Sequence, residues 1–254
     1  MEYFVNEGSV VRQIWGKGDT ILFIFAGAAA EFALSKAIDW LYFTGRIPAD
    51  PLGRLFSTVS YARKIVFAEK EAALRAIDTM SVIHSGVEAR RGMSIPDWAY
   101  RDVLFMLIDY SIRSFELLER RLSEAEKHEV FDVFKRVGSR MGIASLPGTF
   151  KEWEVARLEH LHENLRKSSY TDDLYKQYHA HLGLVSYKIV LEVQKLIVPT
   201  KVHELLHLKK ISFLKPLIGL YKLSRKMNLD WFLKSLILPA EYKDEIKALD
   251  GAPE

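Results

Sequence analysis

The chain contains no cysteine. This absence excludes disulfide bonds, zinc knuckles, iron–sulfur clusters and catalytic thiols, so His, Asp, Glu and Tyr remain as metal ligands and acid–base groups. Glycine and proline are sparse, with 14 and 8 residues among 254, which excludes collagen-like and low-complexity classes. Because hydrophobic residues make up 49% of the chain, one globular domain of this length can bury a substantial core.

The sequence also lacks a long hydrophobic run and a strong excess of one charge. Its most apolar stretch, Thr20–Ala30, ends at Glu31 and is shorter than the roughly 20 residues that cross a bilayer, so it predicts a buried helix. The first residues show no secretory signal pattern, which favours a cytoplasmic protein. The net charge of +3 argues against a nucleic-acid partner.

Positive charge is concentrated near the C-terminus. Residues 195–238 hold nine Lys and Arg against two acids, a charge of +7, and because the whole chain carries +3 the remainder carries −4. We therefore divide the chain into a helical domain, 1–199, and a basic C-terminal helical extension, 200–254. The extension interleaves lysines with apolar residues, which suits either peripheral contact with an anionic membrane or packing on the domain. These apolar residues are Phe213, Leu214, Leu217, Ile218, Leu220, Tyr221, Leu223, Trp231, Phe232, Leu236 and Ile237.

Helical periodicity dominates the sequence, and strand-like alternation is nearly absent. The pattern predicts one central helix from the cap candidate Asp19 to about residue 41, then helices over about 52–67, 69–91 and 97–121. Further helices begin near Ser123 and Thr149, each with a glutamate at capping-box spacing, and near Thr171. The sequence therefore predicts an all-α, globin-like domain of nine or ten helices.

His84 lies on an apolar stripe of the predicted 69–91 helix. Ala73, Ile77, Met80 and Val87 share this stripe at spacings of three and four residues, so the imidazole faces the interior. It is either a hydrogen-bonded core histidine or an axial ligand to a haem iron.

Arg54 and Thr58 lie one turn apart on the preceding predicted helix, with Tyr61 on the same side. This side is either a solvated polar face or a site for an anionic group such as a haem propionate.

Several short motifs, taken in order, resemble the MpaB-type oxygenases, which share a catalytic domain with the rubber oxygenases, or latex-clearing proteins. The motifs are DPLGRLFST at 50–58, HSGV at 84–87, WAY at 98–100, LIDYS at 107–111, and Leu146-Pro147 with Phe150. The likeness covers about residues 15–199. It implies an all-helical domain that binds haem b, with His84 as the proximal ligand to the iron and with Arg54 and Thr58 at the haem.

Two positions depart from the family pattern. Rubber oxygenases carry a lysine before the motif threonine that can occupy the distal iron site, whereas this chain has Ser57. The early family helix often reads Gly-Gly-x-Arg, with a later Gln and His-Pro, whereas residues 27–31 read GAAAE. Glu31 is a candidate pocket base whose pKa burial would raise, or an acid paired with Lys36 or an arginine. Thr58 and Glu31 are therefore the candidate catalytic residues.

Two histidine patterns offer weaker metal candidates. His203 and His207 belong to an H-E-x-x-H sequence, but lysines flank it and no third ligand follows at a recognisable spacing, so we do not expect zinc there. The pairs His160/His162 and His179/His181 have a spacing that turns two imidazoles to different helix faces, so we expect surface residues.

Together these features predict a haem b-dependent oxygenase-like protein acting on a hydrophobic, unsaturated small molecule or lipid. The alternatives are a non-catalytic haem- or lipid-binding helical protein, and a structural helical domain without a cofactor.

Overall fold

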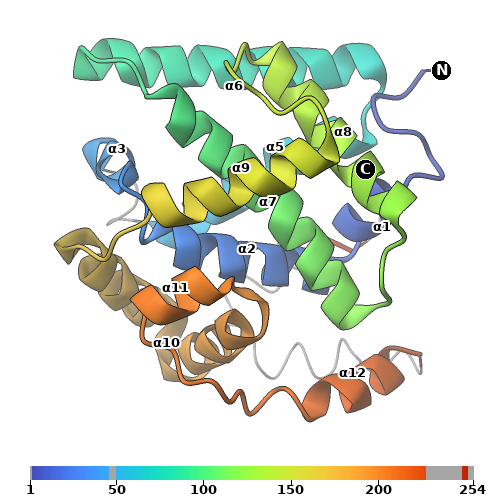
Figure 1. Ribbon diagram of the computed structural model, residues 1–254, viewed down its shortest axis with the longest axis vertical. Coiled ribbons are helices and arrows are strands. Elements are labelled where there is room, and N and C mark those ends of the chain that lie inside the picture. Colours follow the sequence, from blue (N-terminus) through green and yellow to red (C-terminus); the bar gives the residue numbers. More distant parts are fainter. Residues whose placement is uncertain (1, 46–49, 227–247, 251–254) are drawn as a thin grey trace.

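The computed structural model describes residues 2–45, 50–226 and 248–250 (Figure 1). These residues form eleven helices and no strand beyond two isolated bridges, which confirms the all-α prediction. The helices are α1 (Val10–Trp15), α2 (Gly18–Phe32), α3 (Ile38–Phe43), α5 (Pro51–Phe67), α6 (Lys70–Arg91), α7 (Asp97–Leu118), α8 (Glu124–Arg140), α9 (Phe150–Glu163), α10 (Ser169–Ile197), α11 (Thr200–Leu205) and α12 (Leu217–Lys226). The globin-like arrangement stays a prediction.

The helix starts follow the capping residues closely. Ser123 and Glu126 form the predicted capping box at the start of α8. Thr149 accepts a hydrogen bond from the Glu152 backbone N–H, but the Glu152 carboxylate binds the N–H of Gly148, one residue before the expected position. Both caps satisfy backbone donors that the first turn leaves free.

The single central helix predicted to run from Asp19 to about residue 41 is wrong. The N-cap position is Lys17 rather than Asp19, α2 ends at Phe32 and α3 begins at Ile38. Between them the Lys36 N–H donates to the Asn164 carbonyl, and Leu34 accepts from the Arg166 N–H. A backbone bridge to the segment after α9 therefore replaces the helical hydrogen bonds that a continuous helix would make here.

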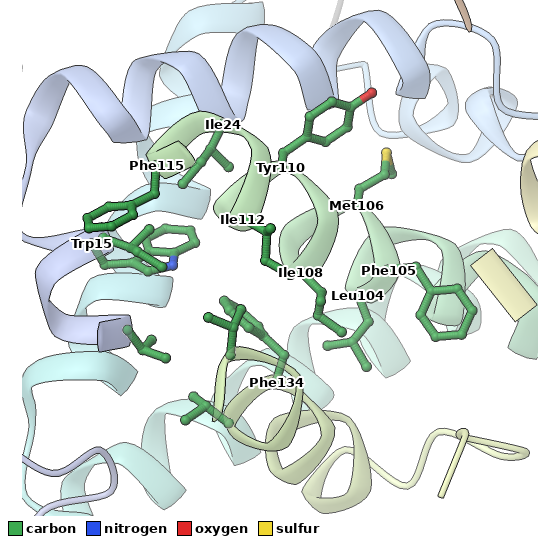
Figure 2. Packing of buried hydrophobic residues seen from close by; sticks show 14 of the residues in the cluster. Trp15, Ile24, Leu104, Phe105, Met106, Ile108, Tyr110, Ile112, Phe115 and Phe134 are labelled. Carbon is green, nitrogen blue, oxygen red and sulfur yellow. The ribbon is translucent and has the colours of Figure 1, made fainter. Parts of the chain in front are cut away.

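The core lies where α2 and α7 pack together, with α1, α8 and α10 against them and α5 packed on α1 and α10 (Figures 1 and 2). Trp15 is fully buried and meets the Phe25 ring edge-on at 6.2 Å and the Phe134 ring at 5.9 Å. Gly27 of α2 lies against the Tyr110 ring of α7, where a Cβ atom would come within 2.4 Å of the ring carbons. The missing side chain therefore lets the two central helices approach closely.

The segment after Pro199 contacts the same body. Val202 is fully buried, and Leu249 belongs to the main core cluster. Tyr221 of α12 donates a hydrogen bond to Asp19, and Lys222 donates to the Glu119 carbonyl. The division of the chain at Pro199 stays a prediction, and Trp231, Phe232, Lys234, Leu236 and Ile237 lie outside the described residues. Among the described helices, none is both long and apolar enough to span a bilayer.

Candidate functional site

His84 is half-buried on α6, facing the first turn of α7. Its ring meets the Tyr100 ring edge-on, with centroids 5.3 Å apart and an interplanar angle of 76°. Of the two ring nitrogens, Nδ1 is buried. The predicted inward orientation of the imidazole is thus partly realised, because the ring is held against α7 while the residue keeps some solvent contact.

Glu88 fixes the position of Tyr100. It follows His84 by four residues on α6, so the two side chains share a helix face. Its Oε1 atom accepts hydrogen bonds from the Ile95 N–H at 2.7 Å and from the Tyr100 hydroxyl at 3.2 Å. Burial, assisted by the Glu88 charge, raises the pKa of Tyr100, so the phenol stays protonated and remains a donor. The sequence analysis did not single out Glu88, although its spacing from His84 was a usable signal.

Apolar side chains from α3, α6 and α7 meet beside this histidine. Trp40 and Ala99 are buried there, and the cluster also includes Ala37, Val87, Ile95 and Trp98. The Arg91 guanidinium lies 4.0 Å from the Trp40 ring centroid and pairs with Asp39 at 2.5 Å, which ties α3 to the end of α6. Val87 follows His84 by three residues on α6, so this apolar cluster begins one turn from the histidine.

Arg54 and Thr58 lie on α5. Two residues connect α5 to α6, and the two helices pack against each other. Arg54 precedes the end of α5 by 13 residues and His84 follows the start of α6 by 14. At 1.5 Å per residue, both lie about 20 Å along their helices from the shared connection. Thr58 is half-buried, whereas the side chain of Arg54 lies outside the described residues. Arg54 and His84 therefore lie at similar distances from the connection, whereas Thr58, nine residues before the end of α5, lies about 14 Å from it.

Glu31 has a different environment, at the centre of a buried polar network. Its carboxylate accepts two hydrogen bonds from Arg157, at 2.5 and 2.7 Å, and one from the Tyr110 hydroxyl at 2.9 Å. Arg157 also donates to Asp109, with Nη2 at 2.9 Å. Glu31 is fully buried and Arg157 is 4% exposed, so these charges are paired out of contact with water.

The network continues through His160, which the sequence analysis placed on the surface. That prediction is wrong, since His160 is 5% exposed. Its Nε2 lies 3.1 Å from Glu31, and its Nδ1 contacts Asp102, whose carboxylate also accepts from the Asn164 amide at 3.0 Å. Only a protonated imidazole donates to both carboxylates. Burial alone would lower the pKa of His160, but its bonds to Asp102 and Glu31 raise it above its ordinary value.

The expected rise in the pKa of Glu31 is also wrong. Burial favours the neutral acid, but the charge and hydrogen bonds of Arg157 and the contact with His160 outweigh it and lower the pKa to about 2. Glu31 is thus the acid paired with an arginine that the sequence analysis offered as its alternative, whereas Lys36 bonds to the Glu163 carbonyl. A carboxylate held in this way is a poor proton acceptor near neutral pH.

The residue pattern of α9 indicates a buried polar network, which was not among the predictions made from the sequence. Trp153, Arg157, His160 and Leu161 recur at spacings of four, three and one on α9, and all four are buried. Two residues of this stripe, Arg157 and His160, belong to the polar network. Their partners Asp102 and Asp109 lie seven residues apart on the buried side of α7. A charged residue inside an apolar stripe indicates a buried partner, but its identity depends on which helices meet.

The H-E-x-x-H sequence does not form a single helix face. The helix α11 ends at Leu205, and His207 lies beyond it with a left-handed backbone φ of 52°. Zinc coordination by this motif requires both imidazoles on one helix. Among the described residues, no group of three or more His, Asp or Glu side chains is arranged so that it could hold a metal ion. His162 and His179 are exposed and His181 is half-buried.

The two candidate regions lie on opposite sides of the start of α7. Tyr100 meets His84 of α6, whereas Asp102, two residues later, meets His160 of α9. The structure places His84 on α6, a neighbour of the helix α5 that carries Arg54 and Thr58, and places Glu31 in a separate group of ion pairs.

A family model described as the catalytic domain of ER-bound oxygenase mpaB/B' and rubber oxygenase matches residues 13–218. This range contains both candidate regions and most of the described helices. No curated protein and no solved structure gives a significant match to the chain.

Proposed function

The chain belongs to the mpaB and rubber oxygenase catalytic-domain family, and we propose that it is a haem b-dependent oxygenase acting on a hydrophobic, unsaturated substrate. Family membership makes the domain oxygenase-like and the protein an oxidoreductase. The haem, its ligands and the substrate class are the proposed parts, and the cytoplasmic location stays a prediction.

The observation that carries the haem proposal is the position of His84. A haem iron needs an axial ligand on a rigid element beside apolar walls. His84 lies on a 22-residue helix, with its ring against Tyr100 and the apolar cluster around Trp40 alongside. Because Nδ1 is buried, Nε2 would be the nitrogen that binds the iron.

Further features of α6 fit a flat apolar group. Ile83, directly before His84, is 47% exposed, and Val82 is 71% exposed. Exposed aliphatic side chains next to a candidate ligand offer surface that a macrocycle would cover. These side chains of α6 are compatible with a haem beside His84, and the family resemblance implies the same histidine as the ligand.

Arg54 and Thr58 would serve two different parts of the haem. A guanidinium binds a carboxylate through paired hydrogen bonds, so we assign Arg54 to a propionate. We assign the half-buried Thr58 hydroxyl to the oxygen-binding side, since it lies one turn further along α5. Glu31 is not assigned the role of base, because its carboxylate is held ionised by Arg157.

Haem iron, when bound, supplies the oxygen chemistry that no protein side chain provides. The chain would contribute the His84 imidazole as the ligand to the iron, with Tyr100 and Glu88 positioning that imidazole. The substrate is assigned as hydrophobic from the family resemblance, and the apolar cluster that includes Val87, three residues after His84, is compatible with this assignment.

Ser57 favours a second candidate, a non-catalytic haem- or lipid-binding protein. Serine stands where the rubber oxygenases have a lysine, and a hydroxyl on this half-buried residue does not replace an amine as an iron ligand. In that case the protein would hold haem without turning over a substrate.

Oxygen uptake by haem-reconstituted protein separates the two candidates. We expect uptake with an olefinic lipid, and none with its saturated analogue or with haem-free protein. Haem bound at one per chain without uptake for any olefin would favour the non-catalytic candidate.

A further inference from the structure

Residues 209–223, here called the 209–223 surface, expose an unusual density of large apolar side chains. Ile211 and Phe213 are each 77% exposed, and Leu217, Leu220 and Leu223 are each more than half exposed. Soluble surfaces tolerate scattered apolar residues, whereas five within thirteen positions mark an interaction site.

This surface is firmly attached to the body. The Phe213 N–H donates to Glu192 at 2.7 Å, and the buried Ser212 hydroxyl donates to the Glu192 carbonyl at 3.2 Å. On α12, Tyr221 donates to Asp19 at 3.1 Å, and Lys222 donates to the Glu119 carbonyl at 3.2 Å. The segment that carries the exposed apolar side chains is therefore held to the body by hydrogen bonds on its inner side.

The helix α12 has two different apolar faces. Ile218 and Tyr221 are half-buried toward the body, whereas Leu217, Leu220 and Leu223 recur every third residue on the outer side. In Figure 1, α12 lies along one border of the molecule. A helix that needed only to pack on the body would carry polar residues on this outer face.

The charge on this surface is of one sign. Lys209, Lys210 and Lys215 are exposed among the apolar residues, and the sequence contains no Asp or Glu between residues 205 and 229. We propose that the 209–223 surface docks onto an anionic lipid bilayer, with the apolar side chains at the headgroup boundary and the lysines on anionic headgroups. A second copy of the chain fits less well, because a symmetric contact would bring the same lysines together.

The proposal does not depend on the haem, so it can be tested on haem-free and reconstituted full-length protein alike. Sedimentation is measured with vesicles of phosphatidylcholine alone and with vesicles that also contain 30% phosphatidylserine. We expect binding to the phosphatidylserine vesicles only, with affinity at least tenfold lower when sodium chloride rises from 50 to 500 mM.

Matched variants separate the charge from the apolar side chains. Replacing Lys209, Lys210 and Lys215 by Gln should lower the affinity more than tenfold, since each lysine contributes about fivefold. The same change at the exposed Lys151, Lys176 and Lys188 should have little effect. Leu220→Gln should weaken binding, whereas Leu158→Gln on α9, at a similarly exposed leucine, should not.

Three results would overturn the proposal. These are absence of the protein from both vesicle pellets, equal binding to neutral and anionic vesicles, and a dimer in solution that Leu220→Gln dissociates. The last result would assign the surface to a second copy of the chain.

Discussion

Arg157 and Glu31 lie 126 residues apart in the chain and form a doubly hydrogen-bonded ion pair in the core. The pair joins α9 to α2, and Asp109 and Tyr110 add α7 to the same group. Three helices are therefore held together by charged side chains whose stabilising effect depends on all partners being present.

Arg157→Met should destabilise the fold by about 3 to 5 kcal/mol, because it leaves Glu31 and Asp109 buried without their cation. Chemical denaturation followed by circular dichroism gives the free energy of unfolding. Arg120→Met is the matched control, since Arg120 forms a similar two-point pair with Glu126 at the surface. The control should change stability far less, and equal effects of the two substitutions would contradict the role assigned to the buried pair.

His160 should make stability depend on pH above neutrality. Its folded pKa is raised, so its contribution is complete below its ordinary value of 6.5 and is lost as pH rises through the folded value. Glu31 acts in the opposite direction, with a contribution present above pH 4.5 and lost as pH falls toward 2.

The difference in unfolding free energy between wild type and His160→Gln should therefore shrink between pH 6 and pH 9. Denaturant titrations at four pH values would measure it. A difference that stays constant across this range would show that His160 is not protonated in the fold.

Gly27→Ala should destabilise the protein by about 1 to 3 kcal/mol, because the added methyl group meets the Tyr110 ring at 2.4 Å. Gly86→Ala, in the middle of α6 with no atom near the new Cβ, should instead raise stability by up to about 1 kcal/mol. Thermal melts of both variants test the close approach of α2 and α7, and a neutral Gly27→Ala would place these helices further apart than described.

Arg54→Ala should weaken haem binding by about 2 to 5 kcal/mol if the guanidinium pairs with a propionate. Thr58→Val should keep the haem and alter the rate of oxygen reaction, since it removes a hydroxyl without changing the shape of the side chain. Transfer of haem to an excess of apomyoglobin measures retention. Normal retention and turnover in both variants would remove this part of α5 from the cofactor site.

The sequence was most informative where a local pattern determines the structure. Ser123 with Glu126 identified the start of α8, because a capping box involves only four neighbouring residues. The sequence pattern predicted the bounds of α5 and α6 to within one residue. His84 was correctly placed on α6 by the same means, although its contact with Tyr100 depends on how α6 meets α7.

Local patterns failed where distant segments decide the outcome. The break after Phe32 results from backbone hydrogen bonds to residues 164 and 166, which no local signal in residues 33–37 indicates. His160 was assigned to the surface from its spacing to His162, whereas Asp102 and Glu31 on two other helices bury it. Likewise Glu31 has a lowered pKa because Arg157 lies beside it, and burial alone predicts the opposite direction.

The visible absorption spectrum of the purified protein, expressed with sufficient iron and haem precursor, tests the central claim most directly. We predict a Soret band and about one haem per chain, with the band lost or strongly shifted in His84→Ala and unchanged in His179→Ala, which alters an exposed histidine on α10. A colourless wild-type protein after haem reconstitution, or a His84→Ala variant with the wild-type spectrum, would contradict the account.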